Sequence, residues 1–151
     1  MKHLLIVFHS QSGNTARLAA AVAEGARQES ETETRLLRAF DAGLDDLLWC
    51  DGLLIGTPEN FGYMSGAVKD FFDRTYNDAE PLGLQRPYGL FVSAGNDGSG
   101  AVREIDRILR GYPMKKVVEP LIAKGEITAA HLDAATELGL TLAAGLAFGI
   151  Y

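Results

Sequence analysis

The sequence predicts an α/β fold of three layers, in which helices cover both faces of a five-stranded parallel sheet with the strand order 2-1-3-4-5. Two observations carry this prediction. Continuous apolar runs, typical of strands covered on both faces, occur at residues 4–8, 52–55 and, more weakly, 88–92. Stretches with apolar residues at helical spacing separate these runs. The length of 151 residues suits a single domain over residues 1–151.

The expected helices alternate with the strands along the chain. The first covers residues 15–28 and is rich in alanine, the second covers 66–76, and the third covers 101–109. The last is expected to begin near Thr128 and to turn four side chains toward the sheet, those of Leu132, Ala135, Leu142 and Leu146. This alternation predicts right-handed crossovers between parallel strands.

Two further strands are expected at the edges of the sheet. The segment Glu33–Leu37 is more polar than the other strands, so one of its sides should meet water. The segment Lys116–Leu121 should form the opposite edge, because Pro120 would remove a hydrogen bond from a central strand.

Composition excludes several classes of function. The chain has 14 basic and 20 acidic residues and a net charge of −6, and its only basic cluster is Lys115-Lys116, so nucleic-acid binding is not expected. No apolar tract reaches the roughly 18 residues of a membrane span. The single cysteine, Cys50, excludes an internal disulfide and any paired-cysteine metal site, which favours a cytoplasmic protein. Cys50 and Trp49 are expected to be packing residues.

A polar loop follows the first strand. Its hydroxyl groups and the amides of the next helix would form a cradle for an anion without a lysine, and the expected guest is a phosphate monoester. The alternative is an ordinary capping turn. Neither the GxxxxGK[ST] nor the GxGxxG pattern is present. The residues of this loop are Ser10, Gln11, Ser12, Gly13, Asn14 and Thr15.

Two more loops are rich in glycine and hydrogen-bonding groups, and both follow central strands. In a parallel sheet such loops lie at the same edge, where ligands bind. They could bond the edge of a flat polar ring, so a planar heterocycle attached to a phosphate fits all three loops. The residues concerned are Thr57, Pro58, Glu59, Asn60, Phe61 and Gly62 in one loop, and Ser93, Ala94, Gly95, Asn96, Asp97 and Gly98 in the other.

These motifs carry a resemblance to a known family. Residues Ser10–Thr15 resemble the phosphate loop of the flavodoxin-like FMN proteins, and residues Gly56–Asp73 are similar to the second loop and following helix of the flavodoxin-like NAD(P)H:quinone oxidoreductases. The resemblance covers essentially the whole chain. It implies a flavodoxin-like three-layer sandwich, bound FMN, ring contacts from Thr57 to Gly62, and further contacts from Ser93 to Gly98.

The resemblance implies NAD(P)H-dependent reduction of a quinone or similar acceptor through FMN, with no catalytic side chain and no metal ligand. The alternative is a flavodoxin-type electron carrier that docks on a redox protein. Quinone reductases of this kind usually carry an insertion in the second half of the fold that this chain is too short to hold. Carriers usually stack the flavin between aromatics of two loops, yet residues 95–100 contain none. The modest charge of −6 favours the enzyme.

Four other side chains near these loops could also contact a ligand. Phe61 and Tyr63 are the candidates for stacking on the flavin, with at least one expected only as a hydrophobic cover. His9 is expected to be a strand-end histidine facing solvent, and Arg17 a surface arginine, although either could face the phosphate. The sequence predicts neither the physiological electron donor nor the oligomeric state.

Overall fold

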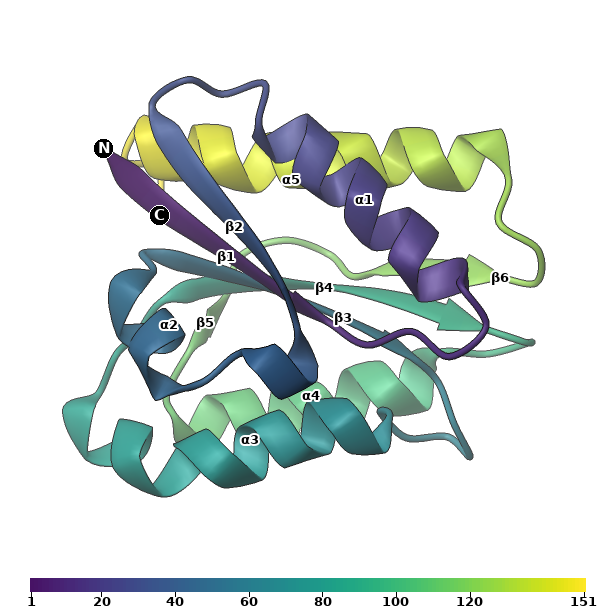
Figure 1. Cartoon of the computed structure of the whole chain (residues 1–151), viewed down its shortest axis with the longest axis horizontal. Coiled ribbons are helices and arrows are strands. Elements are labelled where there is room, and N and C mark those ends of the chain that lie inside the picture. The colour runs from purple at the N-terminus through teal and green to yellow at the C-terminus, as the bar shows by residue number, and fades with distance from the viewer.

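A twisted parallel sheet separates two layers of helices in the computed structural model, which describes residues 1–151 (Figure 1). The strands are β1 (Lys2–Phe8), β2 (Thr32–Arg38), β3 (Gly52–Pro58), β4 (Pro87–Ala94), β5 (Lys115–Lys116) and β6 (Leu121–Lys124). The α-helices are α1 (Asn14–Ala26), α2 (Leu44–Trp49), α3 (Gly66–Ala79), α4 (Ser99–Gly111) and α5 (Ala129–Ala147), with 3-10 turns η1 (Ala39–Asp41) and η2 (Glu80–Leu82).

The strands follow the order β2-β1-β3-β4-β5, and every pairing is parallel. This confirms the predicted fold class and the edge position of the polar strand β2. Helices α1 and α5 cover one face of the sheet, and α2, α3 and α4 cover the other (Figure 1). None of the helices combines the length and apolarity that a membrane span requires.

The far edge of the sheet differs from the prediction of one strand over residues 116–121. Two short strands replace it, because β5 pairs with the start of β4 and β6 pairs with its end. Pro120 lies between them and has no N–H with which to continue the ladder. The chain therefore leaves the sheet and rejoins it four residues after Val117, whose N–H still bonds the Tyr88 carbonyl at 3.1 Å.

Helix α2 has no counterpart among the predicted helices. It has only 6 residues, too few for a clear apolar period. Its start is fixed by Asp46, whose carboxylate accepts the N–H of Gly43 at 2.9 Å and a hydrogen bond from Arg35 at 2.8 Å. The acidic residues Asp45 and Asp46 thus begin a helix, where negative charge is stabilising.

The core has two parts, one on each face of the sheet. The cluster under α1 and α5 includes Leu4, Ile6 and Leu142, and the cluster under the other helices includes Leu5, Val7 and Phe71. Alternate residues of β1 therefore enter opposite clusters, as expected for a strand covered on both sides.

Helices α1 and α5 approach each other closely because glycine lies between them. A Cβ atom built on Gly139 would lie 1.8 Å from the carbonyl oxygen of Val22. No side chain fits there without a shift of one helix. Of the residues predicted to face inward from α5, Ala135, Leu142 and Leu146 are buried and Leu132 is half-buried.

We expect the substitution Gly139→Ala to force α1 and α5 apart and to lower the free energy of unfolding by about 1–3 kcal/mol, the usual range for overpacking. Thermal unfolding followed by circular dichroism measures the loss. The control is Gly66→Ala, since a Cβ at Gly66 meets no atom within 4 Å. Equal melting temperatures for the two variants would contradict this description of the helix contact.

Candidate functional site

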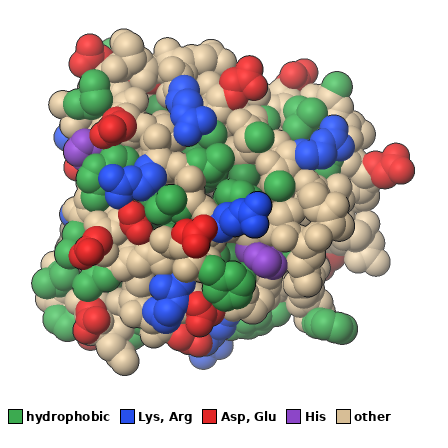
Figure 2. Space-filling view, viewed as in Figure 1, with side chains coloured by type: hydrophobic (Ala, Val, Ile, Leu, Met, Phe, Trp, Pro, Cys, Tyr) green, Lys and Arg blue, Asp and Glu red, His purple; other side chains and the backbone are tan.

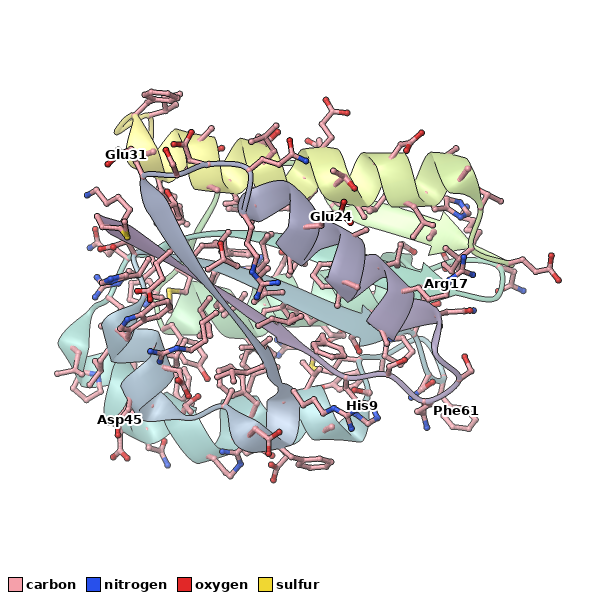
Figure 3. The ribbon with its side chains drawn as sticks, turned by 45° about the horizontal axis from the view of Figure 1, so that its top comes forward. His9, Arg17, Glu24, Glu31, Asp45 and Phe61 are labelled. Carbon is pink, nitrogen blue, oxygen red and sulfur yellow. The ribbon has the colours of Figure 1, made fainter.

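The three predicted loops meet at the carboxyl edge of the sheet and line one cleft. Figure 3 shows Arg17 of α1 and Phe61 of the second loop at this end of the molecule, whereas Glu31 and Asp45 lie at the opposite end. The cleft has a volume of about 790 Å³. It is lined by Gln11, Ser12, Asn14, Arg17, Pro58, Glu59, Asn60, Ser93, Ala94, Gly95, Gly125, Glu126 and Ile127.

The first loop ends in an uncapped helix. Gly13 is the N-cap of α1 and has φ of 103°, a conformation that favours glycine, and no side chain caps the helix. Ser10 instead accepts the N–H of Gly13 at 3.2 Å. The amides of Asn14, Thr15 and Ala16 have no hydrogen-bond partner within the chain. This helix end therefore presents free donors and the positive end of the helix dipole.

A buried hydroxyl pair joins the first loop to the end of β4. The Oγ1 atom of Thr15 lies 2.7 Å from the Oγ of Ser93, and both side chains are buried. Their hydroxyl groups are thus used within the protein. Thr15 and Ser93 hold the start of α1 at the end of β4.

The second loop turns back on itself at Phe61. Asn60 and Tyr63 exchange both backbone hydrogen bonds, at 2.8 and 3.0 Å, and Phe61 and Gly62 have φ of 54° and 70°. Positive values at both central residues are those of a type I′ turn. The Phe61 ring is fully exposed, whereas Tyr63 packs against the core. Of the two stacking candidates, Phe61 is the one with a free ring. The side-chain amide of Asn60 donates to the side-chain carbonyl oxygen of Gln11 at 2.7 Å.

Glu59 ties the second loop to the third. One of its carboxylate oxygens accepts the N–H of Gly98 at 2.9 Å, and the other accepts the N–H of Ala101 at 3.0 Å. Its own N–H donates to the Ser93 carbonyl at 2.8 Å. The carboxylate thus caps α4 from another loop, where the helix dipole stabilises its charge.

Thr57, at the end of β3, stabilises the second loop through its side-chain hydroxyl. Its side chain is fully buried, accepts the N–H of Ser65 at 2.9 Å and donates to the Pro58 carbonyl at 2.8 Å. The side chains of Thr57 and Glu59 are therefore occupied in holding the loop. The parts of this loop that remain available to a ligand are its backbone, Asn60 and Phe61.

The third loop points away from the cleft after Gly95. Asn96 and Asp97 are exposed and do not line it, and Gly98 is buried. Asp97 accepts the Oγ–H of Ser99 at 2.8 Å and its N–H at 3.2 Å, and these bonds hold the pKa of Asp97 below its usual value. Asp97 thus stabilises the start of α4.

Sequence reasoning missed a fourth segment of the cleft. Gly125, Glu126 and Ile127 follow β6, and the N–H of Gly125 bonds the Ala94 carbonyl at 2.8 Å. The sequence predicts an edge strand that ends at Leu121, whereas β6 continues to Lys124, so the loop that follows it is not among the predicted loops. Arg17, expected to be an ordinary surface arginine, lines the cleft as well.

Cys50 and Trp49 lie far from this chemistry, as packing residues. Burial raises the pKa of Cys50 to about 12, so its thiol is not a nucleophile near neutral pH. Trp49 stacks on the His3 ring with centroids 4.4 Å apart. The Arg35 guanidinium lies over the Trp49 ring, 3.9 Å from its centroid. No group of three His, Cys, Asp or Glu side chains could hold a metal ion.

A family model and several curated relatives are similar to this chain in sequence. A family model described as NADPH-dependent FMN reductase matches residues 38–126. A protein named flavodoxin from Aquifex aeolicus is 42% identical over 78 residues, covering 52% of this chain and 42% of the relative. An NAD(P)H dehydrogenase (quinone) from Acidithiobacillus ferrooxidans is 34% identical over 121 residues, covering 66% of this chain and 60% of the relative. The chain thus spans about half the length of these curated relatives.

Solved structures agree on the fold. An archaeal flavodoxin superposes with a TM-score of 0.80 at 24% identity, covering 95% of this chain and 98% of that one. A WrbA-like flavodoxin from Agrobacterium tumefaciens gives a TM-score of 0.79 at 22% identity, covering 99% of both chains. The flavodoxin fold is therefore shared.

We expect Glu59→Gln to lose one of the two acceptors for the N–H groups of Gly98 and Ala101 and to lower the free energy of unfolding by about 1.5–3 kcal/mol, as for hydrogen bonds to charged groups. Thermal unfolding measures this loss. Glu24→Gln is the control, because Glu24 lies exposed on α1 (Figure 3). If both variants melt at the same temperature, the carboxylate does not hold the two loops together.

Proposed function

We propose that this chain, which belongs to the NADPH-dependent FMN reductase family, uses FMN bound in the cleft to transfer electrons from NAD(P)H to a quinone or similar acceptor. The observation that carries the proposal is the cleft itself, built from the loops after β1, β3, β4 and β6 beside an uncapped helix N-terminus. A further supporting point is the similarity to a relative named NAD(P)H dehydrogenase (quinone). We place the protein in the cytoplasm, in keeping with its single reduced cysteine.

The first loop fits the phosphate of FMN. The free amides of Asn14, Thr15 and Ala16 are donors for phosphate oxygens, and the exposed hydroxyl of Ser12 lies at the cleft. Arg17, one turn into α1, adds a positive charge to the same cleft. These groups bind a dianion without needing a lysine.

The second and third loops fit the ring system of FMN. Residues 58–60 and 93–95 of these loops line the cleft. The N–H groups of Glu59 and Asn60 already bond the carbonyls of Ser93 and Tyr63, so the loop carbonyl oxygens, each with a second lone pair, are the backbone groups that suit the ring edge. Glu59 holds the two loops at a fixed separation, because its carboxylate bonds the third loop and the start of α4. Phe61 provides an exposed aromatic ring beside them.

Bound FMN supplies the redox chemistry, taking electrons from a nicotinamide and giving them to the acceptor. The protein's part is to bind and orient the cofactor and to set the electrostatics around it. The proposal assigns no catalytic side chain of its own.

A flavodoxin-type electron carrier is the second candidate function. The similarity to a protein named flavodoxin favours it, as does the full exposure of Phe61 at the rim, where a docking protein could reach. The two functions differ in their donor, since a carrier takes its electrons from a protein rather than directly from a nicotinamide.

We expect the protein to bind FMN more tightly than riboflavin, because only FMN carries the phosphate that the α1 amides receive. Gly13→Val should remove most of this difference, since φ of 103° strains a β-branched residue and the turn that aims the amides must shift. Gly13→Asn should retain more of it, because Asn tolerates positive φ. Fluorescence titration of the apoprotein measures both affinities, and equal affinity of the unaltered protein for the two flavins would refute the phosphate site.

We expect anaerobic NADH or NADPH to bleach the bound flavin and a quinone to restore its colour. Initial rates should follow ping-pong kinetics, because both substrates react in turn at one flavin. Stopped-flow absorbance and steady-state rates measure the two halves separately. If dithionite bleaches the flavin and neither nicotinamide does, the carrier function replaces the reductase.

A further inference from the structure

A second groove opens between helices α3 and α4, which lie side by side on the same face of the sheet (Figure 1). It has a volume of about 470 Å³, which is within the usual range for sites that bind small molecules. None of the residues that line it also lines the FMN cleft. The groove is therefore a separate site.

Aromatic and apolar side chains form the walls of the groove. Phe72 is buried, whereas Tyr63, Tyr76 and Ile108 are half-buried along it. The hydroxyl groups of Tyr63 and Tyr76 make no hydrogen bond within the chain, although other tyrosine hydroxyls do. Apolar ring faces that also carry free hydroxyl groups suit a ligand with an aromatic ring.

A glycine at the end of α4 makes room for one of these walls. A Cβ atom built on Gly111 would lie 2.8 Å from the hydroxyl oxygen of Tyr76 and 2.9 Å from its ring. Any larger residue at this position would displace the end of the Tyr76 side chain. The shape of the groove at this end thus depends on Gly111.

Arg107 is the charged group of the groove that has no partner. Lys69 pairs with Asp73 at 2.5 Å. Glu104 lies 3.5 Å from Arg103. Arg107 is exposed and makes neither an ion pair nor a side-chain hydrogen bond. A free guanidinium beside aromatic walls suits a carboxylate attached to an aromatic ring.

We infer that the groove between α3 and α4 binds a small aromatic carboxylate, with its ring against Tyr63 and Tyr76 and its carboxylate on Arg107. An uncharged compound of the same shape meets the same walls but leaves the guanidinium without a partner, so it should bind more weakly. The inference does not rest on the proposed function, because the groove and the FMN cleft share no lining residue.

The test uses the full chain in excess FMN, which keeps the proposed cofactor site filled, and two probes, 2-naphthoate and its uncharged amide, 2-naphthamide. Calorimetric titration should show tighter binding of naphthoate. Arg107→Gln should weaken naphthoate by about fivefold, the upper worth of an exposed ion pair, and leave naphthamide nearly unchanged. Gly111→Ala should weaken both probes, because the added Cβ displaces the Tyr76 side chain that forms the wall.

Arg110→Gln is the matched control, because Arg110 is an exposed arginine of the same helix that does not line the groove. It should leave both affinities unchanged. The inference is overturned if neither probe binds, if the two probes bind equally, or if Arg107→Gln has no more effect than Arg110→Gln. Naphthoate binding that is unaffected in a folded Gly111→Ala protein would place the ligand outside the groove and would overturn the inference as well.

Discussion

Parallel pairing of every strand is the constraint on which the rest of this structure depends. It sends the ends of β1, β3, β4 and β6 to one edge, so the loops that follow them meet although they are far apart in the sequence. Long crossover connections also join the parallel strands β1 to β5, and the helices α1 to α4 that they carry lie, together with α5, on both faces of the sheet. The cleft is therefore a result of the topology before any side chain is considered.

Side chains then fix the loops to one another. The Thr15–Ser93 hydroxyl pair joins the first loop to β4, the Gln11–Asn60 bond joins the first loop to the second, and the Glu59 carboxylate joins the second to α4. Most of the polar groups expected to face a ligand are used in these bonds. What remains for a ligand is the backbone together with Ser12, Arg17 and Phe61, and backbone held in place in advance binds at a lower entropic cost. On the face shown in Figure 2, basic and acidic side chains are interspersed, so no broad field of one sign is evident there.

The fold could be predicted because its signals are local. Apolar runs identified β1, β3 and β4, and helical spacing identified four of the five α-helices. The parts that were missed depend on contacts distant in sequence or on too few residues. The division of the last edge into β5 and β6 arises from pairing with two ends of β4, and α2 is too short to show a period. The loop positions were also predictable, whereas the role of Glu59 was not, because its partners lie about forty residues away.

The two chain ends provide a practical consequence. Met1 precedes β1 and the last residues follow α5, and both ends lie near each other at the edge of the sheet opposite the cleft (Figure 1). An attachment made at either end, whether a fused protein, a surface tether or an electrode linker, would leave the four loops facing free solution. The molecule can thus be immobilised in a defined orientation, with its cleft directed outward, without altering any residue of the cleft.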